Sequence, residues 1–165
     1  MIIGSISENL EFEKRVAITP DILKKYKSLG MQIYLCKDYA THIGINDNDF
    51  ISEGASILQS NEEVLEKSNL ITQLNLPNEK YLNKLKSDQI LIGVLDSYKN
   101  GGKLKEIIEK KVNCFSLELL PRITRAQSMD ILSSQANLAG YKAVIDSFAF
   151  FQKAIPMMMT AAGTI

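Results

Sequence analysis

The sequence predicts an α/β protein: a largely parallel, flavodoxin-like sheet with helices on both faces, followed by a long C-terminal helix. Three observations carry this prediction. Short apolar stretches alternate with helical patterns of about ten residues as far as residue 117. A polar loop comes next, and a mostly uncharged helical pattern then runs from residue 130 to 153. Strands that alternate with helices favour right-handed crossovers, and hence a parallel sheet that is covered on both faces.

The first strand is expected at residues 1–6, which are mainly apolar. Thr19 is then placed to cap a helix that begins at Pro20, because the proline ring suits the first helical turn. This helix is expected to end near Leu29, with Gly30 as its stop. Residues 32–36 alternate between side-chain types as a second strand does.

The same alternation continues through the middle of the chain. Helices are expected at 47–53, 61–67 with Ser60 as cap, 79–85 and 103–110. Strands are expected at 70–74, 89–95 and 112–117, with a short apolar pair at 57–58 and a turn at 75–77. In an open sheet of this kind ligands lie beyond the carboxyl ends of the strands. Arg15, Asn75, Asp96 and Arg122 follow strands or lie in the connecting loops, so we expect them at one rim.

The polar loop begins after Pro121 and leads into the long helix. Its polar and flanking residues are Arg122, Ile123, Thr124, Arg125, Gln127, Ser128, Met129 and Asp130. Thr124 and Gln127 have the spacing of a capping box, Ser128 is a second possible N-cap, and Asp130 would lie in the first turn. Backbone N–H groups and guanidinium donors would converge there, as in sites that bind amide, carboxylate or phosphate oxygens. A capped helix with solvated arginines explains this chemistry equally well.

The long helix has a narrow polar stripe that includes Lys142 and Asp146, which are spaced to form an ion pair. One flank is apolar, with Leu138, Tyr141, Ile145 and Phe148, and the other carries small side chains. A helix of this composition needs cover on more sides than one small sheet offers. We therefore expect another structural element to pack against it.

Composition excludes several classes of function. Lys plus Arg and Asp plus Glu number 19 each, so the zero net charge gives no reason to expect a nucleic-acid partner. Cys36 and Cys114 lack metal-type spacing and are expected to be buried, reduced thiols. His42 is the only histidine, so we expect a loop residue rather than a metal site. The apolar run at 154–163 is too short to span a bilayer.

The stretch Pro121–Val144, together with Met157–Ile165, resembles the NAD-binding component, or alpha subunit, of proton-translocating nicotinamide nucleotide transhydrogenases, in the alanine dehydrogenase/transhydrogenase family. The resemblance implies that Arg122, Gln127 and Asp130 act together beside the nicotinamide ring, and that Ser133 lies near the cofactor. It also implies NAD(H) as a cofactor that is shared with a Rossmann part. Further implied partners are a membrane domain, an NADP-binding domain and a second copy of the NAD-binding component.

The chain contains no Gly-x-Gly-x-x-Gly fingerprint. The resemblance thus covers only the N-terminal portion of the family's NAD-binding component: an α/β subdomain at 1–128 and a connecting segment at 129–165. We expect a truncated product or gene fragment, inactive alone, although a split subunit would fit the same residues. A cytoplasmic protein, held at the inner membrane through partner subunits, is implied.

Alanine dehydrogenases share the Arg15–Pro20 segment, where the arginine binds the substrate carboxylate. A lysine and a histidine complete their chemistry, but Asn75 and Asp96 stand at those positions here. A neutral amide supplies no cation, and an acid repels a carboxylate, so Arg15, Asn75 and Asp96 form at most a substrate-like pocket. The expected function is therefore hydride transfer between NADH and NADP, coupled to proton translocation, with no residue acting as acid or base. The alternatives are a fragment of an alanine dehydrogenase-like enzyme and a non-catalytic interaction module.

Overall fold

The computed structural model describes the backbone of residues 1–153, 159–160 and 163–164, and the side chains of residues 1–153. Two compact units make up the chain, Met1–Pro121 and Arg122–Ile165. The apolar run at 154–163 falls outside the described side chains. Within the described part of the chain, no helix has both the length and the apolar character needed to cross a lipid bilayer.

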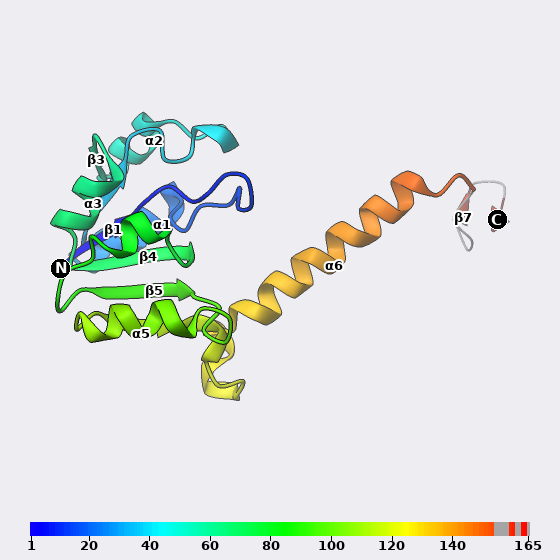
Figure 1. Ribbon diagram of the computed structural model, residues 1–165. Coiled ribbons are helices and arrows are strands. Elements are labelled where there is room, and N and C mark those ends of the chain that lie inside the picture. Colours follow the sequence, from blue (N-terminus) through cyan, green and yellow to red (C-terminus); the bar gives the residue numbers. More distant parts are fainter. Residues whose placement is uncertain (154–158, 161–162, 165) are drawn as a thin grey trace. The chain divides into compact units, whose positions relative to one another are not determined.

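The first unit contains a six-stranded sheet in the order β3-β2-β1-β4-β5-β6, with every pair of neighbours parallel. The strands are β1 (Ile2–Ser5), β2 (Gln32–Cys36), β3 (Ser56–Leu58), β4 (Leu70–Asn75), β5 (Ile90–Val94) and β6 (Asn113–Ser116). The helices are α1 (Pro20–Ser28), α2 (Asp47–Ser52), α3 (Asn61–Lys67), α4 (Glu79–Leu82) and α5 (Gly101–Glu109), with 3-10 turns η1 (Thr41–Ile43) and η2 (Leu117–Leu119). The predicted α/β class, with its parallel sheet, is confirmed. Figure 1 shows β4 and β5 side by side, with α5 returning along β5.

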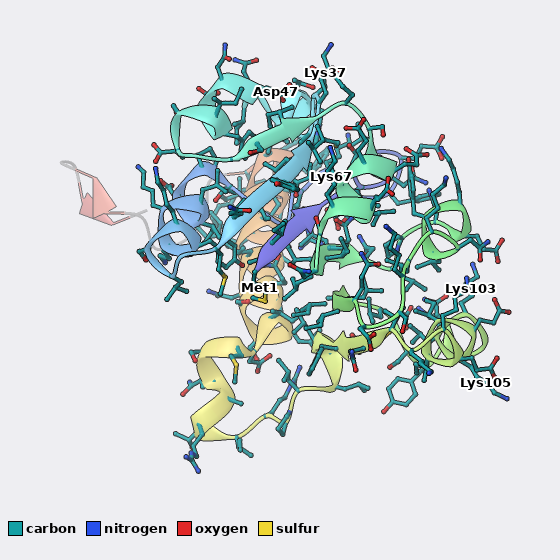
Figure 2. The ribbon with its side chains drawn as sticks, turned by 90° about the vertical axis from the view of Figure 1, so that its left-hand side faces the viewer. Met1, Lys37, Asp47, Lys67, Lys103 and Lys105 are labelled. Carbon is teal, nitrogen blue, oxygen red and sulfur yellow. The ribbon has the colours of Figure 1, made fainter. Side chains whose placement is uncertain are left out.

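Local sequence signals explain where these helices begin and end. The Ser60 hydroxyl accepts a hydrogen bond from the Glu63 N–H at 3.2 Å, so Ser60 is the N-cap of α3, as predicted. Gly30, which follows α1, has a φ of +71°, a left-handed conformation that glycine adopts without strain. The charged side chains of Lys103 and Lys105 project outward from α5 (Figure 2).

The core lies between the sheet and its helices. Leu35, Ile71, Leu91 and Leu65 are fully buried there, and so is Phe50, which packs edge-on against the ring of Tyr39. The Cys36 thiol is buried and free, whereas Cys114 is free but only partly buried, because it lies on the edge strand β6.

The second unit contains the 3-10 turn η3 (Thr124–Met129), the helix α6 (Ile131–Phe150) and an antiparallel pair formed by β7 (Met159–Thr160) and β8 (Gly163–Thr164). Figure 1 shows α6 as one uninterrupted helix. Lys142 and Asp146 form the predicted ion pair, with Nζ and Oδ1 2.6 Å apart.

The predicted start of the long helix was wrong. Thr124 and Gln127 belong to η3, and α6 begins only at Ile131. The N-cap is Asp130, whose carboxylate accepts a hydrogen bond from the Ser133 N–H at 3.0 Å. An acceptor at this position satisfies one of the first backbone donors of the helix, which favours a helix that begins at Ile131. The residues before Asp130 form the tighter turn η3.

Candidate functional site

The polar loop forms a hollow within the second unit. This hollow, called here the Arg122 hollow, has a volume of about 280 Å³ and is lined by Arg122, Ile123, Thr124, Gln127 and Asp130. The turn η3 shapes this hollow. It brings Arg122 and Asp130, which lie on either side of the turn and eight positions apart in sequence, to one space. All five lining residues were predicted from the sequence as members of one site.

Asp130 organises one side of the Arg122 hollow. Its Oδ2 accepts a hydrogen bond from the Ser133 hydroxyl at 2.6 Å, and its Oδ1 accepts the Ser133 N–H at 3.0 Å. The Arg122 Nε lies 3.8 Å from Asp130 Oδ2. The Ser133 hydroxyl, its backbone N–H and the Arg122 charge lower the pKa of Asp130, so this carboxyl group is ionised at neutral pH. A fixed negative charge thus stands beside the Arg122 guanidinium.

Arg122 still has donors available for a ligand. Its side chain is 64% exposed, and it approaches Asp130 through Nε. The two terminal amino groups of a guanidinium are further hydrogen-bond donors. Gln127 is exposed as well, and its amide is both donor and acceptor. Ser133 stands behind Asp130, whereas Ser128 and Met129 lie in η3 outside the lining of the hollow.

A second hollow lies in the first unit, at the carboxyl ends of β1 and β4. This Glu8 hollow has a volume of about 340 Å³. Its lining is formed by Ile6, Ser7, Glu8, Asn9, Phe12, Glu13, Gln73, Asn75, Leu76, Pro77, Asn78 and Tyr81. The location agrees with the general rule for open parallel sheets.

Arg15 and Asn75 meet at Glu13. The guanidinium of Arg15 donates to both carboxylate oxygens of Glu13, at 2.8 and 2.6 Å, and Asn75 Nδ2 donates to Glu13 Oε2 at 3.3 Å. The hydrogen bonds from Arg15 are the largest cause of a Glu13 pKa of about 2. Arg15 therefore forms a bidentate ion pair with Glu13, a residue of its own loop.

Glu8 fastens the same loop to the end of β4. Its Oε1 accepts the Leu74 N–H at 2.7 Å and the Gln73 side-chain amide at 3.1 Å. Gln73 Oε1 in turn accepts the Ile6 N–H at 2.8 Å and the Ser5 hydroxyl at 2.9 Å, so the network continues into the core. Burial is the largest influence on Glu8 and raises its pKa.

Asp96 lies outside the lining of the Glu8 hollow. It follows β5 with a φ of +47°, and its carboxylate pairs with Lys99 Nζ at 2.9 Å. Among the rim residues expected from the sequence, Arg15 and Asn75 are thus brought together, while Arg122 belongs to the second unit. Glu8 and Glu13 were not foreseen as members of the site.

Comparison with known proteins gives a consistent result. The family model described as "Alanine dehydrogenase/PNT, N-terminal domain" matches residues 4–139. One relative is an NAD(P) transhydrogenase alpha-subunit protein of Rickettsia prowazekii, which is one section of a divided subunit. It is 37% identical over 169 aligned positions, which cover 100% of this chain and 44% of that protein. The protein of the same name from Rhodospirillum rubrum is 37% identical over 158 residues, which cover 93% and 41%. The crystal structure of transhydrogenase from Sinorhizobium meliloti matches with a TM-score of 0.88 and 36% identity, over 100% of this chain and 49% of that chain.

The chain therefore spans less than half the length of these relatives. All the residues that line the Glu8 hollow and the Arg122 hollow lie inside the stretch that the family model matches. This stretch makes up most of the chain, so the protein belongs to the alanine dehydrogenase/PNT family, and its residues 4–139 match the N-terminal domain of that family.

Proposed function

We propose that this chain is the N-terminal portion of the alpha subunit of a proton-translocating NAD(P) transhydrogenase, and that its polar loop binds the nicotinamide end of NAD(H). The observation that carries this proposal is the shared hollow of Arg122, Gln127 and Asp130. Relatives named as transhydrogenase alpha subunits, which match the chain over its whole length, support it further.

The chemistry of the Arg122 hollow fits a carboxamide. That group offers one carbonyl acceptor and two N–H donors, and Arg122 supplies donors while Gln127 supplies both kinds of group. Asp130 holds the guanidinium in place, and Ser133 fixes Asp130. Ile123 and Thr124 complete the lining around these polar groups. Ser128 and Met129, which were expected from the sequence to contact the cofactor, lie in η3 outside this lining.

The proposed role of the chain is positioning. NAD(H) supplies the hydride that passes to NADP, and the chain's own groups hold the reacting end in a defined orientation. Asp130 is ionised and engaged with Ser133, so it is an orienting charge rather than a proton donor. Coupling of this transfer to proton translocation belongs to the proposed complete assembly.

The length of the relatives supports the proposal that this chain has partners. The chain matches 44% of a Rickettsia prowazekii protein whose own name makes it only one section of an alpha subunit. We propose a Rossmann domain as the second wall of the NAD(H) site, together with a membrane domain, an NADP-binding domain and a second copy of the NAD-binding component. The assembly would lie at the cytoplasmic face of the inner membrane.

The Glu8 hollow gives less support to amino-acid oxidation. The Arg15 guanidinium donates to Glu13 through Nε and Nη2, and Arg15 does not line the hollow. Asn75, which does line it, supplies no positive charge. The hollow also carries the carboxylate of Glu8, which disfavours a second carboxylate nearby. Asp96, which stands where alanine dehydrogenases have a histidine, lies outside the lining.

The test is single-turnover hydride transfer in a complete transhydrogenase that contains this chain. Arg122→Ala should slow transfer from NADH about a hundredfold, the effect of a small misplacement of a reacting group, while the Kd for NADH rises only a few-fold. Arg125→Ala is the matched control, because Arg125 is exposed in the same turn but does not line the hollow. Unchanged transfer in the Arg122 variant would refute the assigned role. A wild-type rate with Arg122, Gln127 and Asp130 all replaced by alanine would favour a non-catalytic interaction module.

A further inference from the structure

The Glu8 hollow is larger than the Arg122 hollow, and its charge has the opposite character. Its volume is about 340 Å³, and two carboxylates, those of Glu8 and Glu13, line it. The other polar groups of its lining are amides and hydroxyls, and no lysine, arginine or histidine is among the described residues that line it. A ligand inside this hollow therefore meets negative charge and neutral polar groups.

Glu8 is the carboxylate of this hollow that lacks a cationic partner. Glu13 is paired with Arg15, whereas none of the ion pairs among the described residues involves Glu8. Glu8 Oε1 accepts three N–H groups, but Glu8 Oε2 accepts only the Asn75 side-chain amide, at 3.5 Å, within the described part of the chain. Hydrogen bonds from a cation to a carboxylate are typically about 2.7–2.9 Å long, so Oε2 can accept a much stronger donor.

The side-chain nitrogen of Asn75 marks the place where such a donor would lie. It is 3.5 Å from Glu8 Oε2 and 3.3 Å from Glu13 Oε2, so these two oxygens flank one point. A neutral amide stands there, and both of its contacts are long. A protonated amine beside this nitrogen would donate to both carboxylates. Its positive charge would also offset the burial that raises the pKa of Glu8.

The remainder of the wall suits a carbon chain. Ile6, Leu76 and Pro77 supply aliphatic surface. Phe12, which is 85% exposed, adds an aromatic ring, and an aromatic face attracts cations as well as apolar groups. A hollow with apolar walls and a few convergent polar groups is the usual form of a small-molecule site.

We propose that the Glu8 hollow binds a small primary ammonium ion that carries an aliphatic chain. The charged end lies between Glu8 and Glu13, and the chain lies against the apolar wall. An α-amino acid fits less well, because its carboxylate would meet the same two acids. This site is separate from the one proposed for NAD(H), so the proposal goes beyond the proposed function and does not rest on it.

The experiment is a titration of the 165-residue chain with n-butylammonium chloride at neutral pH and constant ionic strength, followed by ¹⁵N–¹H NMR spectra. The probe should bind with a Kd of roughly 1 mM, because it has few atoms. The backbone N–H signals of Leu74 and Asn75, which donate to Glu8, should shift to saturation. The backbone N–H of Ser133, which donates to Asp130 in the second unit, is the internal control and should not move. Sodium butyrate, an anion with the same number of carbons, should leave all three signals in place.

Two variants distinguish a specific site from a general attraction of cations. Glu8→Gln removes the charge but keeps an acceptor, and it should weaken binding about tenfold or more. Asn75→Lys places an ammonium group of the chain itself near the two carboxylates, and it should abolish binding of the probe. Glu11→Gln is the matched control, because Glu11 is exposed in the same loop and does not line the hollow, so this variant should bind like the wild type. Circular dichroism of each variant verifies that it is folded.

Saturable shifts that are lost in both Glu8→Gln and Asn75→Lys support the proposal. The absence of shifts in the wild type, or wild-type affinity in either variant, would overturn it. So would equal shifts with magnesium chloride, which would mean that any cation is attracted. Nucleotide is omitted throughout, so failure here leaves the proposed NAD(H) site untouched, and failure of that site leaves this one untouched.

Discussion

At the residue scale, one tight constraint in the first unit is the missing side chain of Gly4. A Cβ built there would lie 2.2 Å from Ser68 Oγ and 2.8 Å from Val64 Cγ1. The Ser68 hydroxyl is buried and has no hydrogen-bond partner among the described residues. Glycine on the central strand β1 therefore allows α3 to approach closely, at the expense of one unsatisfied polar group.

Gly4→Ala should lower the free energy of unfolding by about 1–3 kcal/mol, the usual effect of overpacking a core. Urea unfolding followed by circular dichroism measures this change. Ser68→Ala should be neutral or stabilising, because it removes an unpaired buried hydroxyl and some of the crowding. Gly102→Ala is the control, since a Cβ at Gly102 in α5 meets nothing within 4 Å. Equal stability of Gly4→Ala and wild type would show that α3 does not pack as described.

Most of the arrangement around single residues could not be read from local patterns. Thr124, Ser128 and Asp130 are all competent N-caps, and only the tight turn η3 decides that Asp130 takes the role. Glu8 was missed because its partners, Gln73 and Leu74, are more than sixty positions away in sequence. A signal was nonetheless present: a carboxylate three residues after the first strand lies near the carboxyl edge of a parallel sheet, where polar groups converge.

At the scale of elements, prediction succeeded where periodicity alone decides the outcome. The helix α3 was predicted from Asn61 to Lys67 and has those bounds, because Ser60 caps it and its buried side chains have helical spacing. The strand β5 is the most apolar stretch, and its expected span of 89–95 shortened only to Ile90–Val94. Element ends were less certain, as for α4, which ends at Leu82 rather than at 85.

The loop between β1 and α1 is an element held mainly by charge, and its stability should depend on pH. Arg15 holds the pKa of Glu13 at about 2, below its ordinary value of 4.5. A lowered folded-state pKa contributes stability above the ordinary value, and this contribution is lost as the pH falls from 4.5 toward 2. Burial raises the pKa of Glu8, so its contribution has the opposite sign and is lost as the pH rises.

Glu13→Gln should therefore destabilise the chain most at neutral pH and progressively less in acid. Urea unfolding at about pH 6 and about pH 3 measures the difference between variant and wild type, which should shrink at the lower pH. Glu8→Gln is the informative comparison, because its effect should change with pH in the opposite direction. A constant difference for Glu13→Gln at both pH values would show that the ion pair with Arg15 does not persist in solution.

At the scale of the whole molecule, the chain contains one proposed half of a cofactor site. The Arg122 hollow, with about 280 Å³, can accept a nicotinamide ring but not a whole dinucleotide. The sequence lacks the Gly-x-Gly-x-x-Gly turn that binds a pyrophosphate at a helix N-terminus. Binding by the 165-residue chain should then come from the nicotinamide end alone.

NADH should therefore bind this chain only weakly, with a Kd of roughly 1 mM, which corresponds to about 4 kcal/mol of binding free energy. Calorimetric titration measures this value. Reduced nicotinamide mononucleotide, which lacks the adenosine half, should bind within about threefold of NADH, since the missing half makes no proposed contact. Arg122→Ala should remove the residual binding of both compounds, whereas Arg125→Ala should leave it unchanged. Micromolar binding of NADH, combined with much weaker binding of the mononucleotide, would instead locate an adenosine or pyrophosphate site within the chain, and the Arg122 hollow would then no longer account for the affinity.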